Sequence, residues 1–278
     1  MGGRAAAGYG EPRTVCRSGG CCHGVSHRHF YPYQGLLFQL AFIWRLEEFS
    51  GTNNHWENDK ESALLRLGFV KPEILSWSPR IILFHNFLSM EECDYLKSIA
   101  RPHLEISTVV DPETGESIKS KVRTSSGMFL SSKDRQIPII KAIEKRIAVF
   151  SQIPTENGES IQVLRYETNQ YYTPHHDYFS DAFNLKNGGQ RVATMLMYLN
   201  DVDEGGETIF PQAGSGECSC GGNKVKGLCM KPRKGNAILF WSMGLDGQSD
   251  PNSLHGACPI VKGEKWSATK WLRQGAIS

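Results

Sequence analysis

Short segments rich in β-branched and aromatic residues, separated by turns with paired glycines, most constrain the fold of this chain. The glycine pairs are Gly188-Gly189, Gly205-Gly206 and Gly221-Gly222. Short strands at such spacing, each followed by a turn signal, are typical of a β-sandwich or barrel. The expected strands are Ile161–Tyr166, Arg191–Leu199, Thr208–Phe210, Asn236–Trp241 and Lys265–Leu272. We therefore expect a mainly β domain with a double-sheet jelly-roll core, whose mouth is wide enough to hold a metal.

Two helices are expected ahead of these strands. The segment Ser89-Met-Glu-Glu92 carries a hydroxyl at the N-cap and a carboxylate three residues later, which is a capping box, and Pro102 marks the end of that helix. A second helix begins at Pro138, because proline is tolerated in the first helical turn. Its apolar stripe is formed by Ile139, Ile140, Ile143, Ile147 and Phe150. Helices supporting one sheet place the domain in the α+β class.

Composition divides the chain into a tail and one folded domain. Residues 1–34 are rich in Gly, Arg, His and Cys without apolar periodicity, so no folded structure is expected there. The polar stretch 50–62 is typical of a linker. The run Trp77–Phe84 fits the first strand. We expect an N-terminal tail over residues 1–76 and the folded domain over residues 77–278.

The tail contains one apolar run, at residues 35–44, preceded by several arginines. Its length suits the apolar region of a signal peptide. The charged segment Arg45-Leu-Glu-Glu48 follows directly, without a small-residue cleavage site. The chain has no run of about 18 apolar residues, the length that a membrane-spanning helix needs. The sequence leaves open whether this run is a signal or a membrane anchor.

Charge and cysteine content limit the partners and suggest the compartment. Lys and Arg total 31 against 29 Asp and Glu, which gives no electrostatic reason to expect a nucleic-acid partner. Three of the eight cysteines, Cys218, Cys220 and Cys229, share one Gly-rich loop, whereas Cys93 and Cys258 stand alone. The clustering favours disulfides and an oxidising compartment over free thiols. It does not determine the pairing.

A His-x-Asp pair and a distant histidine predict a metal site. Alternate residues of a strand point to the same face, so His175 and Asp177 can reach one ion while His176 points away. His255 lies far enough along the chain to return beside them across a barrel. Two imidazoles and one carboxylate with open positions opposite are the ligand pattern of non-haem Fe(II) oxygenases.

A lysine near the third ligand suggests the co-substrate. Strand alternation places Lys265, Ser267 and Thr269 on one face. If this face lines the barrel interior with His255, the lysine is a buried cation, and such a charge needs an anion. The distal carboxylate of 2-oxoglutarate meets that need. Tyr166, at the end of an earlier strand, is placed to donate its hydroxyl to the same carboxylate.

From about Pro79 to Leu272 the chain resembles the plant-type prolyl 4-hydroxylases. The resemblance rests on several motifs in the same order. They are Val122-Arg-Thr-Ser-Ser-Gly127, Tyr172-Thr-Pro-His-His-Asp-Tyr-Phe179, Asn187-Gly-Gly-Gln-Arg-Val-Ala-Thr194, Glu204-Gly-Gly-Glu-Thr-Ile-Phe-Pro211, Ser253-Leu-His-Gly-Ala-Cys-Pro259 and Gly263-Glu-Lys-Trp-Ser-Ala-Thr-Lys-Trp271.

The resemblance implies a double-stranded β-helix that uses Fe(II), 2-oxoglutarate, O2 and ascorbate. By motif match, His175, Asp177 and His255 are the iron ligands, and Lys265 binds 2-oxoglutarate with help from Tyr166. The implied reaction is 4-hydroxylation of peptidyl proline in proline-rich chains of the hydroxyproline-rich glycoprotein type, with decarboxylation of 2-oxoglutarate to succinate and CO2. The implied location is the lumen of the endoplasmic reticulum or Golgi, with membrane association left open.

The resemblance also implies a groove for the substrate. A proline-rich peptide is already extended as polyproline II, so docking it against aromatic rings costs little ordering entropy. The residues in segments that resemble this groove are Arg123, Ser125, Tyr172, Arg191 and Trp271. Two alternatives stay open from the sequence. One is a 2-oxoglutarate oxygenase acting on a non-prolyl acceptor, and the other is a non-catalytic module that binds proline-rich peptides.

Overall fold

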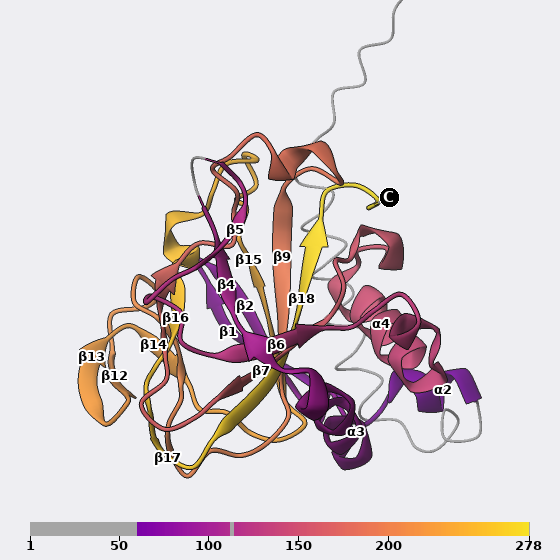
Figure 1. The fold of residues 1–278 in the computed structure, drawn as a ribbon, viewed down its shortest axis with the longest axis horizontal. Helices are drawn as coiled ribbons and strands as arrows, with labels where there is room; N and C mark the ends of the chain where they lie inside the picture. Colours follow the sequence, from indigo (N-terminus) through magenta and orange to yellow (C-terminus); the bar gives the residue numbers. More distant parts are fainter. Residues whose placement is uncertain (1–59, 112–113, 278) are drawn as a thin grey trace, which may run out of the picture.

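The computed structural model describes residues 60–111 and 114–277 and contains a large and a small antiparallel sheet (Figure 1). The large sheet has eight strands in the order β1-β2-β15-β9-β18-β7-β6-β3. These strands are β1 (Lys71–Trp77), β2 (Arg80–His85), β3 (Glu105–Ile106), β6 (Ser126–Phe129), β7 (Gln162–Tyr166), β9 (Arg191–Tyr198), β15 (Ala237–Trp241) and β18 (Lys265–Arg273). The central strand β18 thus comes later in the chain than its two neighbours, β9 and β7.

The small sheet has four strands in the order β14-β11-β16-β8. They are β8 (Tyr172–His175), β11 (Thr208–Phe210), β14 (Leu228–Met230) and β16 (His255–Ala257). The remaining strands form three two-stranded pairs. These are β4 (Thr108–Val110) with β5 (Ser117–Lys119), β10 (Glu204–Gly205) with β17 (Ile260–Lys262), and β12 (Glu217–Cys220) with β13 (Asn223–Lys226).

The predicted jelly-roll architecture is confirmed. The five strands expected after residue 160 are present, each within one residue of its expected bounds. The strand expected over Trp77–Phe84 is instead divided by a turn at Ser78-Pro79, where β1 ends and β2 begins. Side-chain alternation along β9 divides its residues between two hydrophobic clusters. Met195 and Met197 pack in the cluster that contains the helices, whereas Tyr198 packs in the cluster between the two sheets. The space between the two sheets is therefore lined by alternate residues of the strands, as a jelly-roll mouth requires.

Both predicted helices are present and cover one face of the large sheet (Figure 1). Helix α3 (Met90–Ala100) begins at Ser89, whose side chain accepts a hydrogen bond from the Glu92 amide while the Glu92 carboxylate accepts one from the Ser89 amide. Helix α4 (Pro138–Ser151) packs its predicted stripe into the same core. A buried ion pair between Arg146 of α4 and Glu92 of α3, with an N···O distance of 2.8 Å, joins the two helices.

Described structure begins earlier than the boundary expected at residue 77. Helix α2 (Lys60–Leu65) includes the last residues of the predicted linker, and β1 pairs with β2 along its length. Edge strand β1 contains Pro72 and is exposed at most positions, so it lacks a clear apolar alternation. The predictions for the tail and for the run at 35–44 concern positions outside the described residues. Within the described ranges, no helix combines the length and apolar character needed to span a bilayer.

Two disulfides form at the Gly-rich loop, where the clustered cysteines predicted them. Cys218 pairs with Cys229, and Cys220 pairs with Cys258. The first closes the β12–β13 hairpin on β14, and the second attaches the hairpin to the segment that follows β16. The thiol of Cys93 is free and buried in the helix–sheet core, where burial raises its pKa to about 12.

Candidate active site

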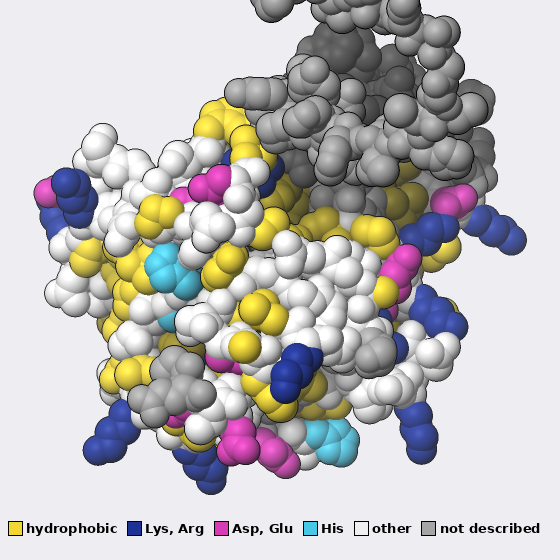
Figure 2. All heavy atoms as spheres, turned by 90° about the horizontal axis from the view of Figure 1, so that it is seen from above, with side chains coloured by type: hydrophobic (Ala, Val, Ile, Leu, Met, Phe, Trp, Pro, Cys, Tyr) yellow, Lys and Arg dark blue, Asp and Glu magenta, His cyan; other side chains and the backbone are white. Residues whose placement is uncertain are grey.

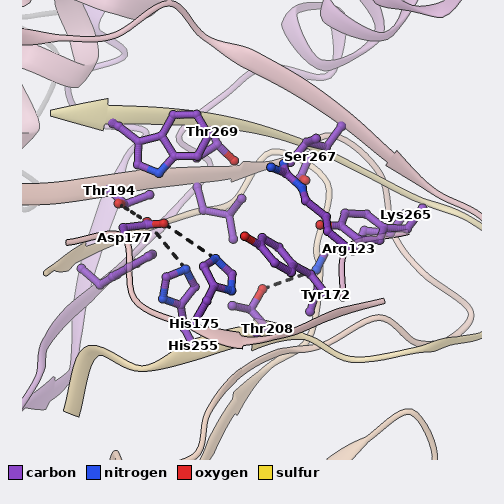
Figure 3. A pocket seen from close by; sticks show the side chains of 17 residues that line it. Arg123, Tyr172, His175, Asp177, Thr194, Thr208, His255, Lys265, Ser267 and Thr269 are labelled. Atoms are coloured by element: carbon purple, nitrogen blue, oxygen red, sulfur yellow. Dashed lines mark hydrogen bonds and ion pairs between the residues drawn. The ribbon is translucent and has the colours of Figure 1, made fainter. Parts of the chain in front are cut away.

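The three predicted metal ligands converge in a pocket between the two sheets (Figure 3). His175 ends β8 and His255 begins β16, and antiparallel pairing places the two residues directly opposite each other. Asp177 follows two residues after β8 and is buried. The Nε2 atoms of His175 and His255 lie 3.7 and 3.6 Å from the Asp177 carboxylate oxygens. The three ligand atoms all lie within 4.8 Å of one another.

Backbone contacts orient both imidazoles for metal binding. The Nδ1–H of His175 donates to the Thr173 carbonyl at 2.9 Å, and that of His255 donates to the Ser253 carbonyl at 3.0 Å. Each bond leaves the Nε2 lone pair directed toward Asp177, because a neutral imidazole has one donor and one acceptor nitrogen. Burial and the neighbouring His255 lower the pKa of His175 to about 3, so its ring is neutral at pH 7.

The carboxylate is held ionised beside these rings. Burial alone disfavours its charge, but the imidazoles, Arg191 and the Thr194 hydroxyl outweigh burial and lower the pKa of Asp177. Thr194, on β9, donates to Asp177 Oδ2 at 2.6 Å. Two imidazole nitrogens and one ionised carboxylate fit the facial ligand set of Fe(II). The Nδ1 atom of each imidazole and one oxygen of the carboxylate are hydrogen-bonded to the protein. Such outer hydrogen bonds are usual for metal ligands, because they fix the ligand orientation.

His176 lies outside the cluster of possible metal ligands, and the local geometry differs from an ideal strand. Strand β8 ends at His175, so strand alternation does not govern the next two residues. His176 is exposed, and its Nδ1 lies 3.3 Å from Ser253 Oγ. The Asp177 side chain returns to the interior because Thr194 and the two imidazoles hold it there.

Lys265 lies in the same pocket, away from the triad (Figure 3). Its side chain is only 1% exposed, and burial lowers the pKa of its amine to about 7, against the opposing charge of Glu207. The Nζ atom lies 3.4 Å from Thr208 Oγ1. It also lies 5.7 Å from the ring centroids of both Tyr166 and Tyr198.

The structure therefore places a cation at the far end of a pocket that begins at a metal triad. Lys265 pairs with Tyr166 in the register of β18 and β7, so the two side chains share the inner face. Ser267 and Thr269 line the same pocket, as strand alternation predicted. The cavity volume is about 50 Å³. A short dianion with one end at the metal and its distal carboxylate at Lys265 suits this arrangement.

A wider groove of about 580 Å³ opens from the pocket beside the triad. Arg123, Tyr172, His175, Asp177 and Trp271 line both cavities, so the groove and the pocket are continuous. Figure 2 shows one face of the molecule from above, with most Lys and Arg side chains near the edge of that face and hydrophobic and uncharged side chains toward its centre.

Cation–aromatic contacts rigidify this groove. The Tyr172 ring stacks on His175 at 3.7 Å, and the Arg123 guanidinium lies 4.9 Å from the Tyr172 centroid. Burial raises the pKa of the Tyr172 hydroxyl to about 12. The Arg191 guanidinium lies 4.0 Å from the Trp271 ring and forms a two-bond ion pair with Glu159, with both N···O distances at 2.7 Å. Of these contacts, those to Trp271 and Tyr172 fix the aromatic walls.

Four of the five predicted substrate residues line the groove, and Ser125 does not. Ser125 is buried, and its hydroxyl donates to Ser107 Oγ at 3.0 Å. Sequence reasoning also missed residues that complete the site. Glu159 follows a 3₁₀ turn and pairs with a distant arginine, so no local pattern marks it. Thr194 and Thr208 lie on predicted strands, so side-chain alternation along those strands could have indicated that both face the pocket.

Comparison with known proteins identifies the same chemistry. The model of the 2OG-Fe(II) oxygenase superfamily matches residues 161–273. Prolyl 4-hydroxylase 1 of Arabidopsis thaliana is 64% identical over 262 residues, covering 88% of this chain and 93% of that protein. The probable prolyl 4-hydroxylase 3 of the same plant is 55% identical over 227 residues, covering 78% of this chain and 77% of its own length.

A solved structure shows a similar fold. The viral collagen prolyl hydroxylase of Paramecium bursaria Chlorella virus-1, in complex with 2-oxoglutarate, is 28% identical with a TM-score of 0.53. The match covers 69% of this chain and 95% of the viral protein. The fold, the metal triad and the full-length relatives agree, and the chain belongs to the prolyl 4-hydroxylase family of 2-oxoglutarate- and Fe(II)-dependent dioxygenases.

Proposed function

We propose that this dioxygenase hydroxylates C4 of peptidyl proline in extended, proline-rich polypeptides, with His175, Asp177 and His255 binding Fe(II). The observation that carries the proposal is the continuity between the triad pocket and the groove, since a substrate in the groove passes directly beside the metal ligands. The chemistry supplied by the bound iron is O2 activation, coupled to decarboxylation of 2-oxoglutarate to succinate and CO2.

In this proposal Lys265 binds the distal carboxylate of 2-oxoglutarate, and Tyr166 donates its hydroxyl to the same group. Both side chains are buried, so the pairing takes place away from water, where opposite charges attract strongly. A lysine that is only 1% exposed otherwise carries an unpaired buried charge, which is costly. The tight enclosure also keeps bulk water from the reacting centre.

The groove suits a polyproline II segment. Such a segment has no internal hydrogen bonds, and its rings pack on aromatic surfaces. Tyr172 and Trp271 supply these surfaces beside the triad, and Arg123 and Arg191 hold the two rings in place.

We also propose a luminal location in the endoplasmic reticulum or Golgi, with ascorbate keeping the iron reduced. The disulfides Cys218–Cys229 and Cys220–Cys258 support an oxidising compartment. The run at residues 35–44, if it acts as a signal or anchor, directs the domain there. Fusing residues 1–60 to a fluorescent protein tests whether this segment directs the protein to the lumen. Fluorescence confined to the cytosol contradicts the luminal location.

The decisive experiment follows succinate formation and the mass of a proline-rich peptide with Fe(II), 2-oxoglutarate and O2. We expect succinate release to be coupled to a mass increase of one oxygen, and fragmentation to place the oxygen on proline. Coupling only to a non-prolyl acceptor overturns the substrate assignment. Peptide binding without turnover indicates a binding module. His175→Ala tests the iron assignment, because activity retained in that variant contradicts it.

A further inference from the structure

Phe179, two residues after the metal ligand Asp177, is a buried aromatic residue that contacts two arginines. The guanidinium groups of Arg191 and Arg273 both lie over its ring, at 4.6 and 4.5 Å from the ring centroid. A cation over the face of an aromatic ring is attracted to it, and more strongly where water is excluded. The side chain of Phe179 is only 7% exposed, so it offers little surface to a bound peptide.

The Arg191 guanidinium connects this ring to the wall of the groove. It also lies over the Trp271 ring, at 4.0 Å from the centroid. Trp271 belongs to the central strand β18 and lines both the triad pocket and the groove. One cation is therefore shared by a ring of the segment after Asp177 and a ring of the groove wall. The place of Arg191 over Trp271 thus depends in part on Phe179.

A shared carboxylate lets the two arginines lie close together. Glu159 Oε1 accepts from Nε of Arg191 at 2.7 Å and from Nε of Arg273 at 2.6 Å. The negative charge between the guanidinium groups offsets their mutual repulsion. Four side chains consequently form one continuous set of contacts, which we call the cation–aromatic stack: Arg273, Phe179, Arg191 and Trp271.

The backbone of Phe179 is fixed by one side chain, that of Gln190. The Gln190 Oε1 atom accepts from the Phe179 amide at 2.7 Å, and its Nε2 atom donates to the Phe179 carbonyl at 3.0 Å. Two such bonds to one residue are what a paired antiparallel strand would supply. Because β8 already ends at His175, the amide of Gln190 takes the place of a strand neighbour. Gln190 is only 4% exposed.

Arg273 holds the far part of the same segment. Its Nη1 atom donates to the carbonyls of Asn184 and Gly189, at 2.7 Å each. The segment between Phe179 and Gln190 is therefore attached at both ends to side chains that take part in the stack or support it. Residues 178–181 and 184 of this segment line the groove, so these attachments also fix a second side of the groove.

We propose that Phe179 and Gln190 are positioning residues for the peptide substrate, which set the groove wall by keeping Arg191 in place over Trp271. The proposal rests on the proposed function, since it concerns a proline-rich peptide bound in the groove. Gln190 acts on the backbone of Phe179, and Phe179 acts on Trp271 through Arg191. Neither residue has to touch the peptide.

Phe179→Leu removes the ring and keeps an apolar side chain. We expect the KM for a proline-rich peptide to rise about tenfold, which corresponds to about 1.4 kcal/mol and lies within the range for a cation–aromatic contact away from water. The peptide Kd, measured by calorimetry, should rise by the same factor. The KM for 2-oxoglutarate should not change, because Lys265 contacts Thr208, Tyr166 and Tyr198 instead of the stack.

Two variants and one control separate positioning from general loss of stability. Phe179→Tyr keeps a ring under both arginines and should bind peptide like the unmodified chain. Gln190→Met keeps the length of the side chain without its two hydrogen bonds and should raise the peptide KM. Phe150→Leu is the matched control: Phe150 is 4% exposed and packs on the rings of Phe84 and Phe87 in the helix–sheet core. It should leave the peptide KM unchanged.

The outcomes distinguish this proposal from the proposed function. If the unmodified chain neither binds nor hydroxylates a proline-rich peptide, the proposed function fails and the positioning role fails with it. If the unmodified chain acts on the peptide but Phe179→Leu, shown to be folded by thermal unfolding, keeps the same peptide KM, only the positioning role is refuted. An equal rise in Phe150→Leu or in Phe179→Tyr also contradicts it. Gln190→Met decides alone if Phe179→Leu does not fold.

Discussion

The hydrogen bond from Thr194 to the ligand carboxylate yields a quantitative prediction for iron affinity. Thr194 is 2% exposed, and its hydroxyl donates to Asp177 Oδ2 at 2.6 Å. Thr194→Val replaces the hydroxyl by a methyl group of similar shape. Hydrogen bonds to charged groups contribute about 1.5–3 kcal/mol, so a value of about 2 kcal/mol predicts about a 30-fold rise in the Kd for Fe(II). The substitution acts on the orientation of the carboxylate and leaves all three ligand atoms in the chain.

The assay is an anaerobic Fe(II) titration, with thermal unfolding of the metal-free protein as the measure of folding. Thr269→Val is the matched control, because Thr269 is also buried and lines the same pocket without bonding to Asp177. We expect the control to bind Fe(II) like the unmodified chain. The reasoning is refuted if Thr194→Val folds normally and retains full iron affinity, or if both valine variants lose affinity equally.

Three further predictions follow from buried charges. Lys265→Ala should weaken 2-oxoglutarate binding by about 2–5 kcal/mol while the Kd for Fe(II) stays constant, and calorimetry that shows unchanged 2-oxoglutarate affinity contradicts its role. Because burial lowers the pKa of Lys265 to about 7, its charge is present below that pH and lost above it, so the KM for 2-oxoglutarate should rise between pH 6 and pH 8. Glu92→Gln leaves Arg146 buried without its 2.8 Å partner and should reduce the unfolding free energy by about 3–5 kcal/mol, measured by denaturant titration; a loss below 1 kcal/mol contradicts this.

Strand periodicity and metal-ligand spacing predicted the central parts of this molecule. Lys265 and Ser267 alternate with core residues on a strand that is buried along its full length, so the inner face could be read directly. The capping box at Ser89 likewise marked the start of α3, because that signal depends on neighbouring residues alone.

Features made by distant residues could not be predicted in the same way. Disulfide pairing depends on how β12 reaches the segment after β16, and no local pattern specifies that contact. The ion pair of Arg191 with Glu159 joins two segments by tertiary packing. Asp177 reaches the metal site although β8 ends before it, because the hydrogen bond from Thr194 and the two facing imidazoles hold its carboxylate there in place of strand alternation.

The position of β18 in the large sheet has a consequence for biosynthesis. This strand lies between β9 and β7, although the chain reaches it after both of them. During translation its two neighbours therefore wait with unpaired edges, which are templates for aggregation, until β18 leaves the ribosome. The strand that closes the sheet also brings Lys265, and His255 precedes it by only ten residues. The nascent chain thus acquires its third iron ligand, the co-substrate lysine and the strand that closes the large sheet within one short stretch of synthesis.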